Sequence, residues 1–143
     1  MTTSFEQRHA ALRLANAVRS SRAAFRLHVE RWTPRRHGFQ FCAWLVESDP
    51  LPEWSRTWKV LTFLKIVPGV GRARILDLRR ELWFLAKPNL TLEDMTAVQR
   101  EELANALRRS LPSARAFDPD TADRGMYEAL VQDCTGIYER NSR

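Results

Sequence analysis

The sequence contains few cysteines, few glycines and no long apolar run. No stretch approaches the roughly 20 apolar residues that a membrane-spanning helix needs. The first seven residues, Met-Thr-Thr-Ser-Phe-Glu-Gln, lack the basic start and apolar stretch of a signal peptide. Cys42 and Cys134 are the only two cysteines and form no CxxC motif, which predicts two free, buried thiols instead of a disulfide or a metal site. We therefore expect a cytoplasmic protein without a membrane segment.

The composition is that of a folded globular chain. Of its 143 residues, 44% are apolar and five are tryptophans, so enough apolar surface is present to offset the entropy lost on ordering. Domains commonly run to about 100–150 residues. We expect one domain, with or without an appended tail.

Positive charge is concentrated in the N-terminal half. The formal net charge is +6, yet residues 1–80 hold 15 Lys and Arg against 6 Asp and Glu, while residues 81–143 hold 8 against 11. Such asymmetry favours a polyanionic partner, of which nucleic acid is the leading candidate. Nearly all the cations are arginines, which suits phosphate recognition and equally suits a GC-rich genome.

The chain reads as a series of helices separated by proline and glycine breaks. Residues 5–32 lack Gly and Pro and carry an apolar stripe of Leu14, Val18, Phe25 and Val29, which predicts a long first helix. A basic turn over residues 34–38 is expected to follow it. Further helices are predicted over residues 39–47, 53–67, 72–85, 96–109 and 123–139, with one helical turn at 91–94 and a linker at 110–122. Thr96 and Gln99 fit a capping box. The predicted fold class is all-α.

The segment Pro68-Gly69-Val70-Gly71 between two predicted helices carries the most specific chemistry. Gly69 and Gly71 permit backbone conformations and close approaches that a Cβ would block. The turn and the helix after it would present amides to an anion, with Arg72 and Arg74 adding charge-assisted bonds to the same phosphates. A tight helix connector with a glycine cap is the alternative. The basic surroundings favour binding to a DNA backbone, through Gly69, Val70, Gly71, Arg72 and Arg74.

The residues around this turn resemble the actinobacterial integration host factor family. Lys59-Val60-Leu61 through Leu64, and then Val67-Pro68-Gly69-Val70-Gly71-Arg72-Ala73-Arg74, are similar to its central signature. The spacing of Leu92, Met95, Gln99 and Leu103 resembles the second helix of its helix–two-turn–helix module. Ala11-Leu12 through Arg22-Ala23 resembles its long basic first helix. The match covers about residues 8–107.

The resemblance implies a small nucleoid-associated protein that binds double-stranded DNA with little sequence preference, bends or condenses it, and assists site-specific recombination. It divides the chain into a basic helical segment (residues 1–48), a helix–two-turn–helix module (49–109) and a linker with a C-terminal helix (110–143). Two departures stand out. Residues 89–94 are acidic where the family carries a basic cluster, and residues 110–143 have no counterpart. That tail would cover an apolar face, form a dimer, or bind a recombinase or another protein.

The first helix offers a second candidate phosphate site. Arg19, Arg22 and Arg26 recur at helical spacings on a face away from the apolar stripe, together with Arg8. Such a face is either ordinary solvated surface or a surface that binds successive phosphates. The presence of the glycine turn in the same chain favours phosphate binding. Trp54, Trp58 and Trp83 are expected in the core.

The sequence offers little for catalysis. His9, His28 and His37 have no carboxylate at metal-ligand spacing, so no metal or other cofactor is predicted. A helix-hairpin-helix DNA glycosylase or lyase is the enzymatic alternative, but Arg72 follows Gly71, and its pKa is too high for Schiff-base chemistry. We therefore expect a non-enzymatic DNA-binding protein. A diverged member of the family that acts through a protein partner is the second alternative.

Overall fold

The computed structural model of this chain describes residues 3–31, 35–109 and 123–143, and these are helical throughout apart from turns and one isolated β-bridge. The all-α prediction is confirmed. The elements are α1 (Thr3–Arg31), α2 (Arg35–Glu47), α3 (Glu53–Arg56), α4 (Val60–Leu64), α5 (Arg72–Glu81), the 3-10 turns η1 (Trp83–Ala86) and η2 (Leu92–Asp94), α6 (Ala97–Arg109) and α7 (Asp123–Ser142). The predicted linker, residues 110–122, lies outside the described residues.

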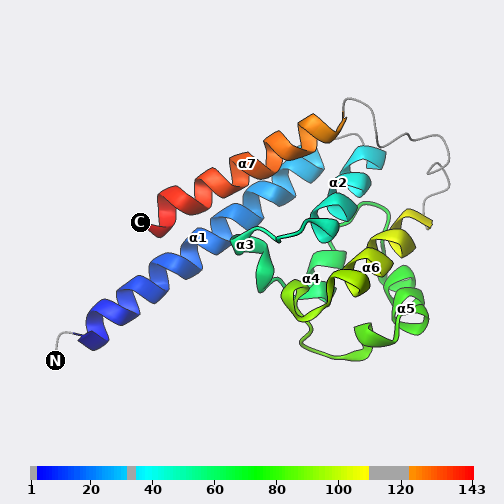
Figure 1. The fold of residues 1–143 in the computed structure, drawn as a ribbon, viewed down its shortest axis with the longest axis horizontal. Helices are drawn as coiled ribbons and strands as arrows, with labels where there is room; N and C mark the ends of the chain where they lie inside the picture. The colour runs from blue at the N-terminus through cyan, green and yellow to red at the C-terminus, as the bar shows by residue number, and fades with distance from the viewer. Residues whose placement is uncertain (1–2, 32–34, 110–122) are drawn as a thin grey trace.

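The C-terminal helix α7 packs antiparallel along the C-terminal half of α1 (Figure 1). Ser21 Oγ donates to the carbonyl oxygen of Cys134 over 2.8 Å, and Trp54 Nε1 donates to Thr135 Oγ1 over 3.1 Å. His28 Nε2 lies 2.8 Å from a carboxylate oxygen of Asp133. The described part of the tail therefore covers an apolar face of α1, which is one of the roles considered for it.

Aromatic side chains fill the core between α1, α2, α3 and α4. Phe25 is fully buried and its ring lies 4.5 Å from that of Phe41 and 5.9 Å from that of Trp54, centroid to centroid. Trp54 and Trp58 are buried as predicted. Trp83 is not, because the chain leaves α5 before it and turns its side chain outward, 76% exposed.

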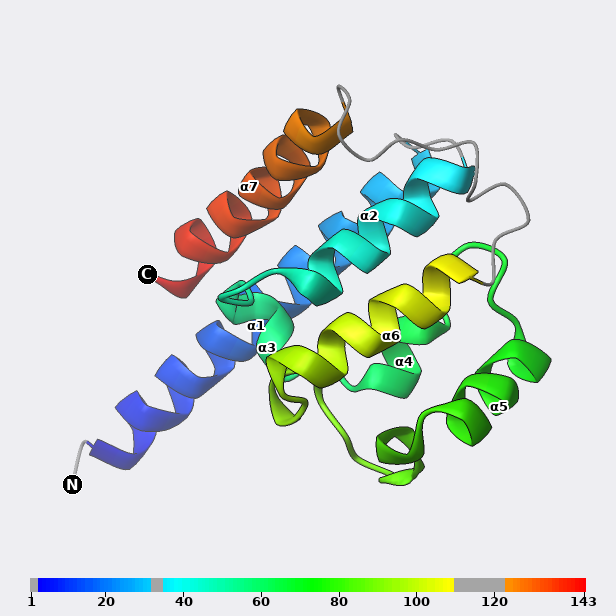
Figure 2. The same cartoon turned by 45° about the vertical axis from the view of Figure 1, so that its right-hand side comes forward.

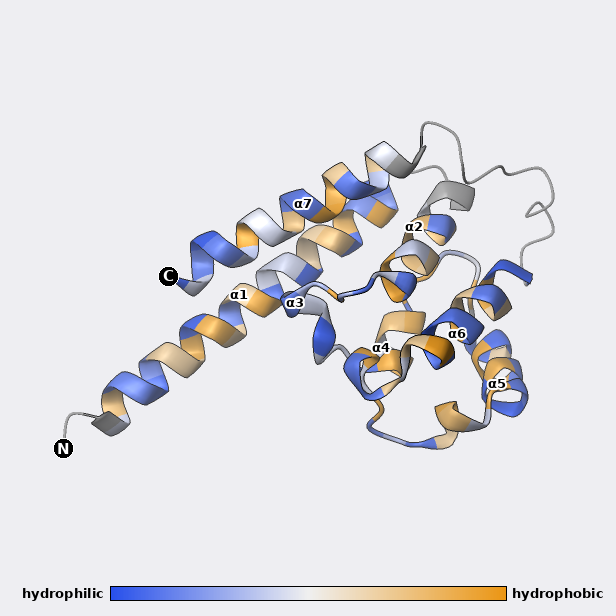
Figure 3. Cartoon of the chain, in the orientation of Figure 1, coloured by the Kyte–Doolittle hydropathy of each residue, from blue (hydrophilic) through white to orange (hydrophobic). Residues whose placement is uncertain are grey.

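The N-terminal half of α1 projects beyond this core (Figure 1). Residues 4–16 are all exposed, and Leu14 of the predicted apolar stripe is 48% exposed, while Phe25 and Val29 of the same stripe are buried. Figure 3 shows hydrophobic and hydrophilic residues alternating along this projecting part. The periodicity predicted the helix correctly, but its N-terminal half has no neighbour to pack against among the described residues.

Three predicted boundaries are wrong. The helix expected over residues 53–67 is two short helices, because Lys59 is extended and forms a β-bridge with Thr91; the amide of Val60 donates to the Leu90 carbonyl over 2.9 Å. The helix expected to reach residue 85 ends at Glu81 and continues as η1. Arg35 to Gly38 were expected in a turn and instead begin α2.

Other local predictions are confirmed. The helix over residues 39–47 forms as part of α2, and the turn at 91–94 forms as η2. The Thr96–Gln99 capping box is present, with both backbone amides bonded to the partner side chain at 3.0–3.1 Å. Cys42 and Cys134 are free and buried. Burial raises the pKa of the Cys134 thiol to about 12, an effect that the Asp133 carboxylate reinforces.

Candidate nucleic-acid interface

The glycine turn joins α4 to α5 much as the sequence suggested. Gly69 has φ 80°, a left-handed conformation in which a side chain would be strained. Val70 is buried, and its amide donates to the Val67 carbonyl over 3.2 Å, which closes the turn. Gly71 differs from the expectation: its φ is −97°, and a Cβ there would meet nothing within 4 Å. The turn therefore requires a glycine at position 69 and not at position 71.

The first turn of α5 is open at its N-terminus. Gly71 is the N-cap residue and supplies no side-chain cap, and the first bond within the helix is from the Ile75 amide to the Gly71 carbonyl, at 3.0 Å. The positive end of the helix dipole therefore meets solvent beside Arg72, which is itself exposed. This is a suitable arrangement for an oxyanion.

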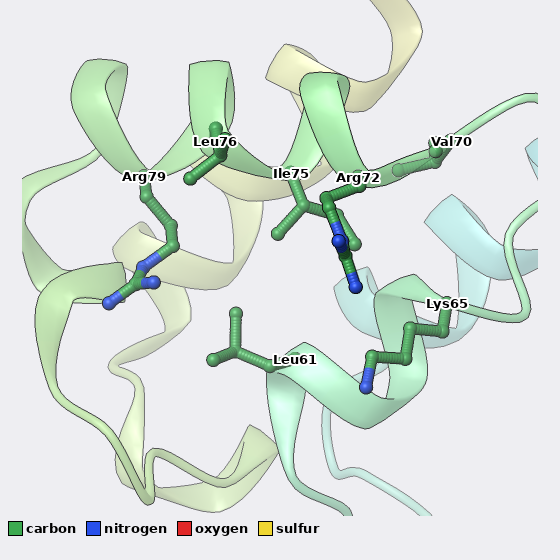
Figure 4. A pocket seen from close by; sticks show the side chains of 8 residues that line it. Leu61, Lys65, Val70, Arg72, Ile75, Leu76 and Arg79 are labelled. Carbon is green, nitrogen blue, oxygen red and sulfur yellow. The ribbon is translucent and has the colours of Figure 1, made fainter.

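A groove of about 620 Å³ runs between α4 and α5. Its floor is apolar, formed by Leu61, Ile75 and Leu76, and its cations are Lys65, Arg72 and Arg79 (Figure 4). In that view Arg72 and Arg79 extend from the two ends of α5, with the apolar side chains between them. We call this surface the α4–α5 groove.

The groove contains two cations that the sequence analysis missed, Lys65 and Arg79. Within the described part of the chain, the side chains of Lys65, Arg79 and Arg72 make no hydrogen bond or ion pair, so all three can bind an external anion. The spacing of Arg72 and Arg79, seven residues along one helix, could have pointed to a shared face. Lys65 follows α4 and meets them only because the turn brings the two helices together.

Arg74, predicted to bind the same phosphates as Arg72, does not line the groove. Two residues along a helix correspond to a rotation of about 200°, so the side chains of Arg72 and Arg74 leave α5 on different sides. The two side chains therefore do not share the groove. Arg74 has interactions of its own within the chain.

The α1 arginines are largely engaged by the protein itself. Arg22 Nε donates to the Trp54 carbonyl over 2.9 Å, its Nη2 donates to Thr57 Oγ1 over 2.8 Å, and the guanidinium lies 5.4 Å from the centre of the Trp58 ring. Burial lowers the pKa of Arg22. These contacts tie α1 to the segment after α2, so Arg22 has a structural role in the fold.

Arg19 and Arg26 are exposed and bonded locally. Arg19 donates to the Asn16 side chain over 2.9 Å, and Arg26 forms an ion pair with Glu30 over 3.1 Å. Exposed pairs of this kind are worth only about 0.2–1 kcal/mol, so an anion can compete for either guanidinium. Arg19 and Arg26 are therefore more accessible to an anion than Arg22, which stays a predicted contact.

The two predicted phosphate sites lie on separate parts of the molecule. Figures 1 and 2 both show α4 and α6 between α1 and α5. Arg19 and Arg26 of α1 therefore do not meet the α4–α5 groove.

The described residues contain neither a candidate metal site nor a candidate membrane span. No group of three or more His, Cys, Asp or Glu side chains there could hold a metal ion. None of the described helices combines the length and the apolar character needed to cross a membrane.

Comparison with known proteins adds no relative: no family model, curated protein or solved structure matches this chain.

Proposed function

We propose that this chain binds double-stranded DNA through its sugar–phosphate backbone, at the α4–α5 groove and the open N-terminus of α5. The observation that carries the proposal is the set of three cations, Lys65, Arg72 and Arg79, that have no partner in the described residues beside a helix end that has no side-chain cap. Phosphate oxygens would satisfy both features. The concentration of positive charge in residues 1–80 and the resemblance to the actinobacterial integration host factor family support the same function.

Backbone contacts carry no sequence information, so binding is non-specific and sensitive to salt. The role is architectural, in the nucleoid, where such a protein condenses DNA or assists recombination. If about 5–7 phosphates are neutralised, log K falls with log[salt] at a slope of roughly −4.5 to −6. Arg19 and Arg26 supply the additional contacts on α1.

The test measures fluorescence anisotropy of a random-sequence duplex of about 20–30 bp across a salt series. The Arg72→Ala/Arg79→Ala variant is compared with Arg140→Ala/Arg143→Ala, which removes the same charge from exposed positions on or just after α7. The groove variant should flatten the salt slope by about 2, because each phosphate contact contributes about 0.9. The α7 variant should leave the slope close to that of the wild type.

Equal losses in the two variants would show that only net charge matters, and the groove would then not be the site. No binding by the wild type at low salt would reject the function altogether. A loss that depends on the duplex sequence would reject binding through the backbone alone.

A further inference from the structure

DNA phosphates leave half of the α4–α5 groove unused. They match its cations, but they offer nothing to the floor of Leu61, Ile75 and Leu76, of which Leu76 is 47% exposed. An occupant that fits both features carries carboxylates around an apolar side chain. Such a surface would bury the floor and pair with the cations at the same time.

The chain itself carries a surface of this description on α6. Val98 is 63% exposed, and Glu101 and Glu102 lie one helical turn further on, so the three share a face. Glu93 precedes that face in η2. Among the described residues, none of the three glutamates forms a hydrogen bond or an ion pair. We call these four residues the α6 acidic face.

We propose that the α6 acidic face of one copy of this chain docks in the α4–α5 groove of another. Val98 packs on Leu76, and the three glutamates lie opposite Lys65, Arg72 and Arg79. The contact therefore sets carboxylates against cations. Because the groove and the acidic face are different patches of one chain, the contact joins unlike surfaces and can continue from copy to copy.

The contact is small and partly ionic, so we expect it to be weak and to lose strength with salt. It uses the same cations as the proposed DNA site, and DNA therefore competes with it. Self-association does not depend on DNA binding, since the occupant is protein.

The experiment is sedimentation equilibrium at about 0.1–1 mM protein and low salt, where weak contacts are populated. Leu76→Glu places a carboxylate in the groove, and Val98→Arg places a cation on the acidic face. Both positions are exposed, so both variants should fold. Leu12→Glu, at an exposed position on α1, is the control.

The wild type and the control should associate at low salt and dissociate in about 0.5 M salt, where charges are screened beyond a few ångströms. Each groove or face variant should be monomeric alone. A one-to-one mixture of Leu76→Glu and Val98→Arg should pair, because the intact acidic face of the first meets the intact groove of the second. A short duplex added to the wild type should dissociate it.

A wild type that stays monomeric over the whole range would overturn the proposal, and so would a mixture that fails to pair. Val98→Arg leaves the groove intact and should bind the anisotropy duplex at least as well as the wild type. Normal DNA binding without self-association rejects only the docking. Self-association without DNA binding rejects only the proposed function.

Discussion

The N-termini of α5 and α6 are completed in opposite ways. Thr96 and Gln99 close α6 with reciprocal bonds between side chains and backbone amides. Gly71 leaves α5 without a side-chain cap. Carboxylates flank the closed end and cations flank the open one, so local charge at α5 is not arranged to stabilise that helix. A helix end that the protein does not complete, beside cations without partners, is suited to an anion from outside.

The strongest test of this difference between the two helix ends is to add a side-chain cap to α5. Gly71 has the extended backbone of an N-cap residue and space for a side chain, so Gly71→Asp should accept an amide bond of the first turn. Its carboxylate then occupies the position proposed for a phosphate. We expect DNA affinity to fall about tenfold, or about 1.4 kcal/mol, while stability stays constant or rises by a few tenths of a kcal/mol.

Gly71→Asp both caps the helix and adds a negative charge. Gly71→Ser separates these two causes of weaker binding, because it caps the helix without adding charge. It should weaken DNA binding by less than Gly71→Asp in the same anisotropy assay. Unchanged DNA affinity in Gly71→Asp would mean that the open end of α5 does not face the duplex.

Substitutions at the two N-cap positions should change the stability of the protein at α6 and hardly at α5. Thr96→Ala leaves an amide of α6 without its partner and should lower the free energy of unfolding by about 1 kcal/mol. Gly71→Ala removes no side-chain bond, and its gain in chain stiffness offsets the poor capping by alanine, so it should change stability by less than about 0.5 kcal/mol. Urea unfolding followed by circular dichroism measures both. Equal losses of unfolding free energy in Thr96→Ala and Gly71→Ala would show that the two helix ends do not differ in capping.

The sequence predicted those parts of the fold that depend on local chemistry. Capping at Thr96, the turn at Gly69 and the length of α1 follow from residue types within a few positions of each other, and all three are present. The break at Lys59 could not be predicted, because it is caused by pairing with Thr91, 32 positions away.

The same distinction applies to the candidate site. The sequence located Arg72 at a glycine turn, but the contribution of Lys65 depends on how α4 and α5 pack. The contacts of Arg22 could not be predicted for a related reason: its face of α1 is polar in the sequence, and only the folded chain brings the Trp54 carbonyl and the Trp58 ring to it. Helical periodicity orders residues around one helix but does not show which face another segment covers.

The smallest effect should come from η2, which is also capped. The amide of Thr91 donates to the Asp94 carboxylate over 3.0 Å, and this bond holds the pKa of Asp94 below its usual value. A carboxyl whose pKa is lower in the folded state stabilises the protein above its unfolded pKa of about 3.9 and loses that contribution as the pH falls through the folded pKa. Asp94→Asn keeps the shape and removes the charge. The urea concentration at the unfolding midpoint should therefore be slightly higher for the wild type than for the variant at pH 7, and the two midpoints should converge in acid. A difference that grows as the pH falls would contradict the role of the charge.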